Sequence, residues 1–129
     1  MATYEPKFCG EYIGVGKYLD NQELCGILSD VVKCPSVFGS EGDCGRLLAK
    51  IAEDNGLTVE IMPTEAEGRF NVMMTLGAEN YMAQKHGLLI HGHYDTVPVL
   101  DMPDPYNTEV VDNKMCGRGI VDQKSGLVA

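Results

Sequence analysis

The sequence contains no tryptophan and no apolar run approaching the roughly 20 residues that a membrane-spanning helix needs. Its lysines and arginines form no cluster, and 10 basic residues against 19 acidic ones give a formal net charge of -9. Such a charge repels a phosphate backbone. We therefore expect neither a membrane nor a nucleic acid as a partner.

A secretory signal and a disulfide framework are also missing. The N-terminal residues lack the continuous apolar core and cleavage site of a signal peptide. The cysteines are odd in number, widely spaced and without a C-x-x-C pair; they are Cys9, Cys25, Cys34, Cys44 and Cys116. We interpret them as reduced thiols that mostly fill the core. A cytoplasmic protein is expected.

The chain is long enough for one compact domain. Residues 1–19 show no clear hydrophobic period, and their glycines disfavour a helix, so we expect an irregular lead-in. From Asp20, apolar residues recur with helical spacing, which predicts an amphipathic helix that ends before Pro35. A second apolar pattern around residues 47–52 predicts another helix, stopped by Asn55-Gly56.

Strand patterns follow the two expected helices. Residues 57–61 alternate, and residues 71–76 form an apolar, β-rich run. Residues 88–90 are uniformly apolar, which predicts a strand buried on both faces in the middle of a sheet. After a long irregular segment, residues 109–116 resemble a small hairpin. This mixture predicts an α/β fold with a layered mixed sheet flanked by helices over residues 20–129.

Metal-capable side chains directly follow the expected buried strand. His93 and Asp95 are two residues apart, so on an extended chain they point to the same face, where an imidazole can bind a metal while the carboxylate orients it. A bare H-x-D also occurs as a polar pair in surface loops. His91 is a competing donor on the same face, and we prefer His93.

A second polar segment, residues 117–126, is a glycine-flanked turn that leads into an expected helix. It has neither the third glycine of a dinucleotide fingerprint nor a P-loop, so phosphate binding is a poor fit. Asp122 lies in this turn. Taken alone, Asp122 is explained as a helix cap.

Together the two segments resemble the paired signature of one enzyme family. The matching residues are Gly92-His93-Tyr94-Asp95-Thr96-Val97-Pro98 and Gly117-Arg118-Gly119-Ile120-Val121-Asp122-Gln123-Lys124. The family is that of acetylornithine deacetylase, succinyl-diaminopimelate desuccinylase, aminoacylase and carboxypeptidase G. Residues 28–39 and the strand at 69–72 extend the likeness. Gln123 and Ser125 depart from the usual methionine and glycine.

The resemblance implies a two-zinc hydrolase of amide C–N bonds in small N-acyl amino acids or peptides. His93 would ligate one zinc, Asp95 would serve catalysis by orienting His93, and Asp122 would bridge both zincs. Cobalt or manganese could replace zinc. The family's Glu-Glu pair, which supplies the general base, and a lid domain through which the parent protein could dimerise would follow residue 129.

The resulting expectation is a zinc-peptidase-like catalytic domain, truncated, whose N-terminal part carries half of the site and is inactive alone. A non-catalytic module that keeps the fold and binds a metal or a partner is the alternative. A third reading is an α/β domain with an accidental H-x-D. The acyl group and amino acid of the substrate stay open.

Overall fold

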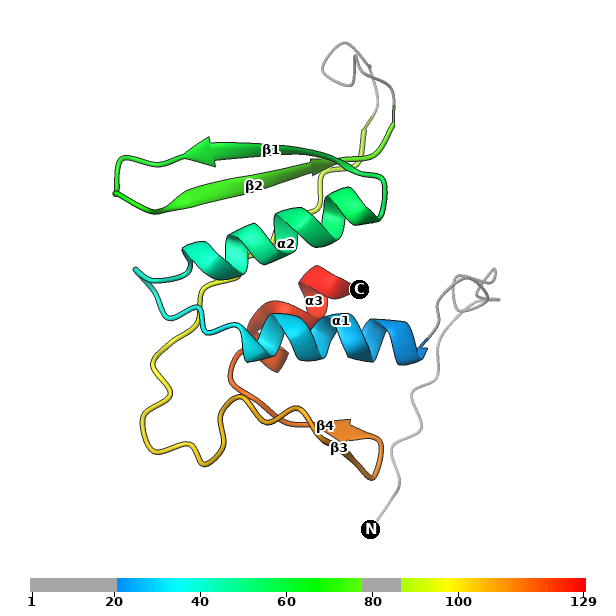
Figure 1. Ribbon diagram of the computed structural model, residues 1–129, viewed down its shortest axis with the longest axis vertical. Helices are drawn as coiled ribbons and strands as arrows, with labels where there is room; N and C mark the ends of the chain where they lie inside the picture. Colours follow the sequence, from blue (N-terminus) through cyan, green and yellow to red (C-terminus); the bar gives the residue numbers. More distant parts are fainter. Residues whose placement is uncertain (1–20, 78–86) are drawn as a thin grey trace.

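The computed structural model describes residues 21–77 and 87–129 (Figure 1). The expected lead-in at residues 1–19 lies outside these residues. In chain order the elements are α1 (Asn21–Lys33), α2 (Gly42–Asp54), β1 (Thr58–Pro63), β2 (Phe70–Thr75), β3 (Val110–Val111), β4 (Lys114–Met115), the irregular turn η3 (Ile120–Lys124) and α3 (Ser125–Val128). The chain combines helices with small antiparallel sheets, which confirms the α/β class.

Both expected helices are confirmed. In α1 the apolar spacing brings Val31 and Val32 to full burial, and the helix ends two residues before Pro35, as a proline requires. In α2 the apolar face is buried at residues including Leu48 and Ala52. Gly56, with a φ of 80°, then lets the chain leave the helix in a left-handed conformation.

The two expected strands near residues 57–76 are confirmed and pair with each other. β1 and β2 form an antiparallel hairpin whose register runs from Thr58 opposite Thr75 to Pro63 opposite Phe70. The hairpin packs on α2, on the side away from α1 (Figure 1). The ion pair between Arg69 and the buried Glu41 joins the hairpin to the start of α2 at 2.5 Å.

A small apolar core lies between α1 and α2. Its centre is made of Val31, Cys44 and Leu48, with Tyr94 and Leu127 among the half-buried residues around it. The interpretation of the cysteines as core filler is right for Cys44 and wrong for two others, because Cys25 and Cys116 are exposed. Cys34 is half-buried, and none of these four is in a disulfide. Cys9 lies outside the described residues.

The prediction of a buried strand at residues 88–90 is wrong. Leu88, Leu89 and Ile90 are 88%, 86% and 81% exposed and form no strand. A strand needs a partner for its backbone groups and a cover for its side chains, and no segment among the described residues supplies either to this run. The described sheets are two antiparallel pairs, supplemented by one parallel bridge between Val37 and Thr96.

The irregular segment after Pro98 and the hairpin that follows it are confirmed. β3 and β4 pair antiparallel across Asp112 and Asn113. Both turn residues have positive φ, 51° and 58°, which is the conformation that a two-residue hairpin loop requires. The chain then enters η3 and α3, which return to pack against α1 (Figure 1).

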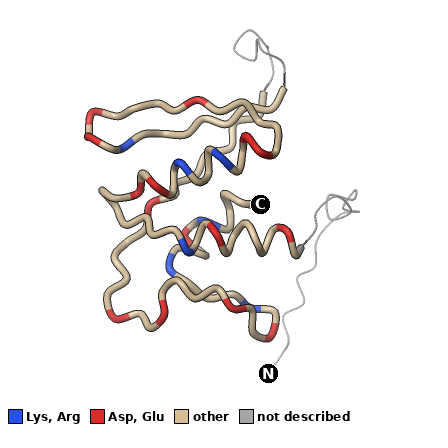
Figure 2. The backbone as a smooth tube through the Cα atoms, in the orientation of Figure 1, with Lys and Arg blue, Asp and Glu red and all other residues tan. Residues whose placement is uncertain are grey.

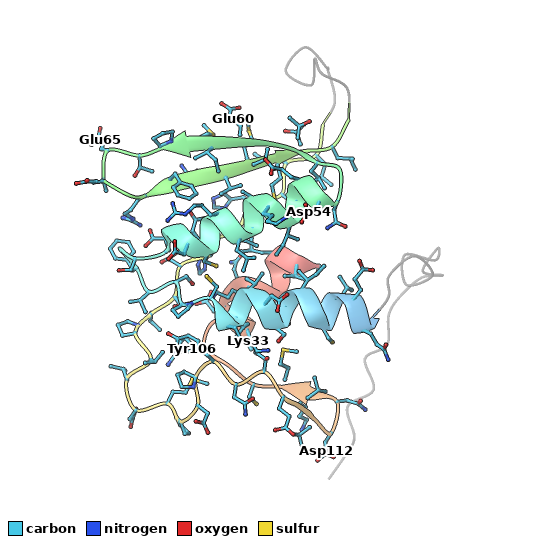
Figure 3. All side chains as sticks on the ribbon, in the orientation of Figure 1. Lys33, Asp54, Glu60, Glu65, Tyr106 and Asp112 are labelled. Carbon is cyan, nitrogen blue, oxygen red and sulfur yellow. The ribbon has the colours of Figure 1, made fainter. Side chains whose placement is uncertain are left out.

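The surface charges are dispersed. Acidic residues occur on every layer of the described chain, and its basic residues do not gather on one element (Figure 2). Glu60, Glu65 and Asp112 point away from the body of the molecule (Figure 3). Within the described ranges, no helix is long and apolar enough to cross a bilayer.

Candidate functional site

The His93 segment is held in place by the turn that follows α1. Thr96 donates its backbone N–H to Ser36 O at 2.7 Å, and its own carbonyl accepts from Phe38 N at 3.0 Å. These two bonds make the parallel bridge of residues 37 and 96. The Pro35-Ser36 turn thereby fixes the backbone next to Asp95.

Side chains alternate about this extended segment. The Tyr94 hydroxyl donates to the backbone carbonyl of Phe70, so Tyr94 turns toward the hairpin. His93 and Asp95 therefore share the opposite face, as the H-x-D spacing predicts. His93 Nδ1 lies 3.2 Å from the backbone oxygen of Asp95 and 3.3 Å from its Oδ1.

The other ring nitrogen of His93 reaches the second polar segment. His93 Nε2 lies 3.0 Å from Asp122 Oδ1, across 29 residues of sequence. The imidazole is thus held between two carboxylates, Asp95 on one side and Asp122 on the other. The side chain of Asp122 is 82% exposed, which leaves its carboxylate open to a further group from solvent.

Two glycines allow these segments to approach closely. A Cβ at Gly92 would lie 2.6 Å from both Gln123 Oε1 and Leu127 Cδ2, so these two side chains would have to shift to admit it. Gly119 has a φ of 87°, and a Cβ there would lie 2.6 Å from Thr96 Cγ2. Because of this positive φ, any other residue would be strained at position 119.

The carboxylates favour the protonated form of His93. Partial burial is the largest single influence and lowers its pKa, but the contacts with Asp95 and Asp122 together outweigh it, so the pKa of His93 is raised. A metal ion would have to displace that proton, because imidazole binds metals as the neutral ring.

The site opens into a cleft of about 230 Å³. Its lining comes from the two polar segments, namely His93, Asp95, Thr96, Val97, Gly117, Arg118, Gly119, Val121 and Asp122. Pockets for complete small-molecule ligands are typically 300–1,000 Å³. The cleft therefore suits an ion or one functional group better than a whole substrate.

The donor set fits part of a zinc site. In metal-binding histidines one ring nitrogen faces the metal while the other is held by a carboxylate or a carbonyl, and His93 is held in this way by Asp95. Asp122 adds a carboxylate oxygen beside the other ring nitrogen, Nε2. Zinc sites use three or four protein ligands. The part of the chain that the structure describes contains no group of three or more His, Cys, Asp or Glu suited to a metal.

The structure brings together the three residues that the sequence singled out. His91, the competing donor, is exposed on the same segment. Asp122 makes no capping bond at η3 or α3, so helix capping does not account for its place. Sequence reasoning assigned no role to Lys124 or to Ser36, and only their burial, at 1% and 0% exposed, reveals them.

Both polar segments lie in a region that is similar to known proteins. The model of peptidase family M20/M25/M40 matches residues 89–129. Succinyl-diaminopimelate desuccinylase 1 of Ruegeria sp. (strain TM1040) is 32% identical over 107 residues, which are 80% of this chain and 27% of that protein. Succinyl-diaminopimelate desuccinylases from two strains of Cereibacter sphaeroides are 32% and 31% identical over the same coverage.

The chain spans about a quarter of the length of these curated relatives. The matched region contains every residue of the cleft, from His93 to Asp122. The chain is therefore similar, over residues 89–129, to the peptidase family M20/M25/M40 and, over 107 residues, to these desuccinylases.

Proposed function

We propose that the chain carries half of the metal centre of a hydrolase that cleaves amide C–N bonds in small N-acyl amino acids or peptides. The observation that carries the proposal is the 3.0 Å approach of His93 Nε2 to Asp122 Oδ1 in an open cleft, with Asp95 behind the ring. The desuccinylase names of the relatives support the deacylase class.

Each of the three residues has a separate task in this proposal. His93 and Asp122 hold zinc through an imidazole nitrogen and a carboxylate, a pairing that zinc accepts readily. Asp95 holds Nδ1 and so fixes both the tautomer and the plane of the ring. When bound, a pair of zinc ions, or cobalt or manganese in their place, supplies an activated water and polarises the scissile carbonyl.

The chain alone lacks a general base in this proposal. The carboxylates that line the cleft are Asp95 and Asp122, and both are already assigned to holding the metal centre. A base must lie within hydrogen-bond reach of the water that it deprotonates. We therefore assign the base, and the pocket that selects the acyl group, to parts of the protein outside this chain. In this proposal residues 20–129 form the N-terminal part of the catalytic domain.

The proposal is tested in the full-length gene product by replacing each ligand. His93→Ala and Asp122→Asn should each lower deacylase activity on N-succinyl and N-acetyl amino acids by more than about 100-fold, because even the residues that orient a ligand contribute 10–100-fold. Asp95→Asn should fall within that smaller range. His91→Ala, on the same segment, is the matched control and should stay within about threefold.

Zinc content separates the enzyme from its alternative. Elemental analysis after dialysis should give about two zinc ions per full-length chain and fewer than one on residues 1–129. Full activity in the His93→Ala or the Asp122→Asn variant would refute the assignment of these ligands. Zinc on neither form would favour a non-catalytic module that keeps the fold.

A further inference from the structure

A buried lysine lies directly beneath the cleft. Lys124 is 1% exposed, although lysine is among the residues least often buried without a partner. Its Nζ donates to Val31 O at 2.8 Å and to Cys34 O at 2.9 Å. Two donors of the ammonium group are thereby used inside the protein.

The carbonyls that Lys124 binds belong to the end of α1. Val31 is in the last turn of that helix and Cys34 follows it. The last carbonyls of a helix lack partners within the helix, and the helix dipole favours a positive charge there. Lys124 therefore caps α1 from a position 90 or more residues further along the chain. This capping explains why the charged ammonium group of Lys124 is tolerated in a buried position.

The same residue closes the turn that carries Asp122. The backbone N–H of Lys124 donates to Gly119 O at 2.8 Å, which encloses Asp122 within the turn. The aliphatic stem of Lys124 runs under Gly119, where a Cβ would lie 3.3 Å from Lys124 Cδ. The turn is thus held between the end of α1 below and Thr96 above.

Other hydrogen bonds of this region also involve residues at or just after the end of α1. Ser29 Oγ and Thr108 Oγ1 are 2.6 Å apart, and Thr96 bonds to the backbone of Ser36. Residues 29–38 therefore fix the segments on both sides of the cleft. Lys124 is the member of this set that belongs to the Asp122 turn itself.

We propose that Lys124 is a positioning residue for Asp122. By binding the end of α1, Lys124 holds the Asp122 carboxylate where it faces His93. Removal of the ammonium group releases the turn from α1, and the carboxylate then loses its register with the imidazole. This inference rests on the proposed function only for the metal readout below. The coupling between α1 and the turn is a property of the metal-free chain.

Amide hydrogen exchange on the unsubstituted protein tests the coupling without any variant. The Lys124 amide and the Cys34 amide, which donates to Asp30 O, should exchange with protection factors equal to within about threefold, because one opening event exposes both. The Asn55 amide at the end of α2 serves as the independent helix end. A Lys124 amide that exchanges far faster than the Cys34 amide would overturn the proposal.

Substitution then tests the effect on the site in the full-length gene product. Lys124→Met keeps the stem and removes the donors, and it should weaken zinc affinity by about 10-fold or more, as loss of a group that supports a ligand does. Leu48→Ala destabilises the same core from α2 without touching the turn, and it should leave zinc affinity within about twofold of the unsubstituted protein.

Equal zinc affinities in Lys124→Met and Leu48→Ala would reduce Lys124 to a structural residue and contradict the inference. If the Lys124→Met protein does not fold, the exchange measurement on the unsubstituted protein decides. Failure of the proposed function would give a different result. The His93→Ala or Asp122→Asn variant would then stay active, while the Lys124 and Cys34 amides would still exchange with similar protection factors.

Discussion

Residues 21–77 and residues 87–129 are held in their folded positions by different interactions. The first region contains two 13-residue helices and two six-residue strands, and it supplies every buried hydrophobic residue among those described. In the second region the strands are two residues long, and the buried side chains are Thr96, Thr108 and Lys124. Apolar packing builds the scaffold, and hydrogen bonds attach the site to it together with the apolar contacts of Tyr94, Leu127 and Val128.

The contrast explains how a small core can position a functional cleft. Apolar contacts are non-directional and resist large displacement, whereas hydrogen bonds specify distance and angle. Thr96 and Lys124 bond mainly to backbone atoms near the end of α1, and those atoms are fixed by the helix and its buried face. The precision of the His93–Asp122 contact therefore derives from one helix end.

The largest effect should come from the core of the first region. Leu48→Ala removes a residue that is 6% exposed, and it should lower the free energy of unfolding by about 2–5 kcal/mol because a cavity is left behind. Urea titration followed by circular dichroism measures the change. Leu76→Ala, the same substitution at an 82% exposed position, should change it by less than about 0.5 kcal/mol. Equal losses would remove the distinction between core and surface.

A smaller, pH-dependent effect should come from the ion pair that joins the hairpin to α2. Burial is the largest single influence on Glu41 and raises its pKa, but its hydrogen bonds and the charge of Arg69 outweigh it, so the pKa of Glu41 is lowered from 4.5. A lowered carboxyl pKa stabilises the folded state above the unfolded value, and that stability is lost as pH falls below 4.5 through the folded pKa.

Glu41→Gln should therefore cost about 1–2 kcal/mol at pH 7 and progressively less as the pH falls below 4.5. Parallel urea titrations at pH 7 and in acid measure this difference. Glu60→Gln on the exposed face of β1 is the matched control and should be near neutral at both pH values. A pH-independent cost for Glu41→Gln would mean that its charge contributes nothing.

The smallest effect on stability should come from the exposed apolar run of the second region. Leu89→Ser should change the free energy of unfolding of the 129-residue chain by less than about 0.5 kcal/mol, because Leu89 is 86% exposed. Binding of a hydrophobic dye should fall, since residues 88–90 form an exposed apolar patch. A loss of stability comparable to that of Leu48→Ala would show that this run is packed in solution.

Local pattern was sufficient for the helices and for the paired strands. The 3.6-residue period located α1 and α2, alternation located β1, an apolar β-rich run located β2, and the pattern of residues 109–116 located the β3–β4 hairpin. The same reasoning was wrong at residues 88–90, because hydrophobicity records a tendency to be buried and the cover must come from elsewhere in the structure.

By itself, the sequence determined the helices, the strands β1 and β2, the β3–β4 hairpin, the α/β class and the placement of His93 and Asp95 on one face of an extended segment, since all of these depend on short-range geometry. The meeting of Asp122 with His93 across 29 residues was implied by the family resemblance alone, and only the tertiary structure decided its geometry and the capping of α1 by Lys124. Those contacts depend on how separate segments pack. A side chain's type and spacing do not specify a partner that lies far along the chain.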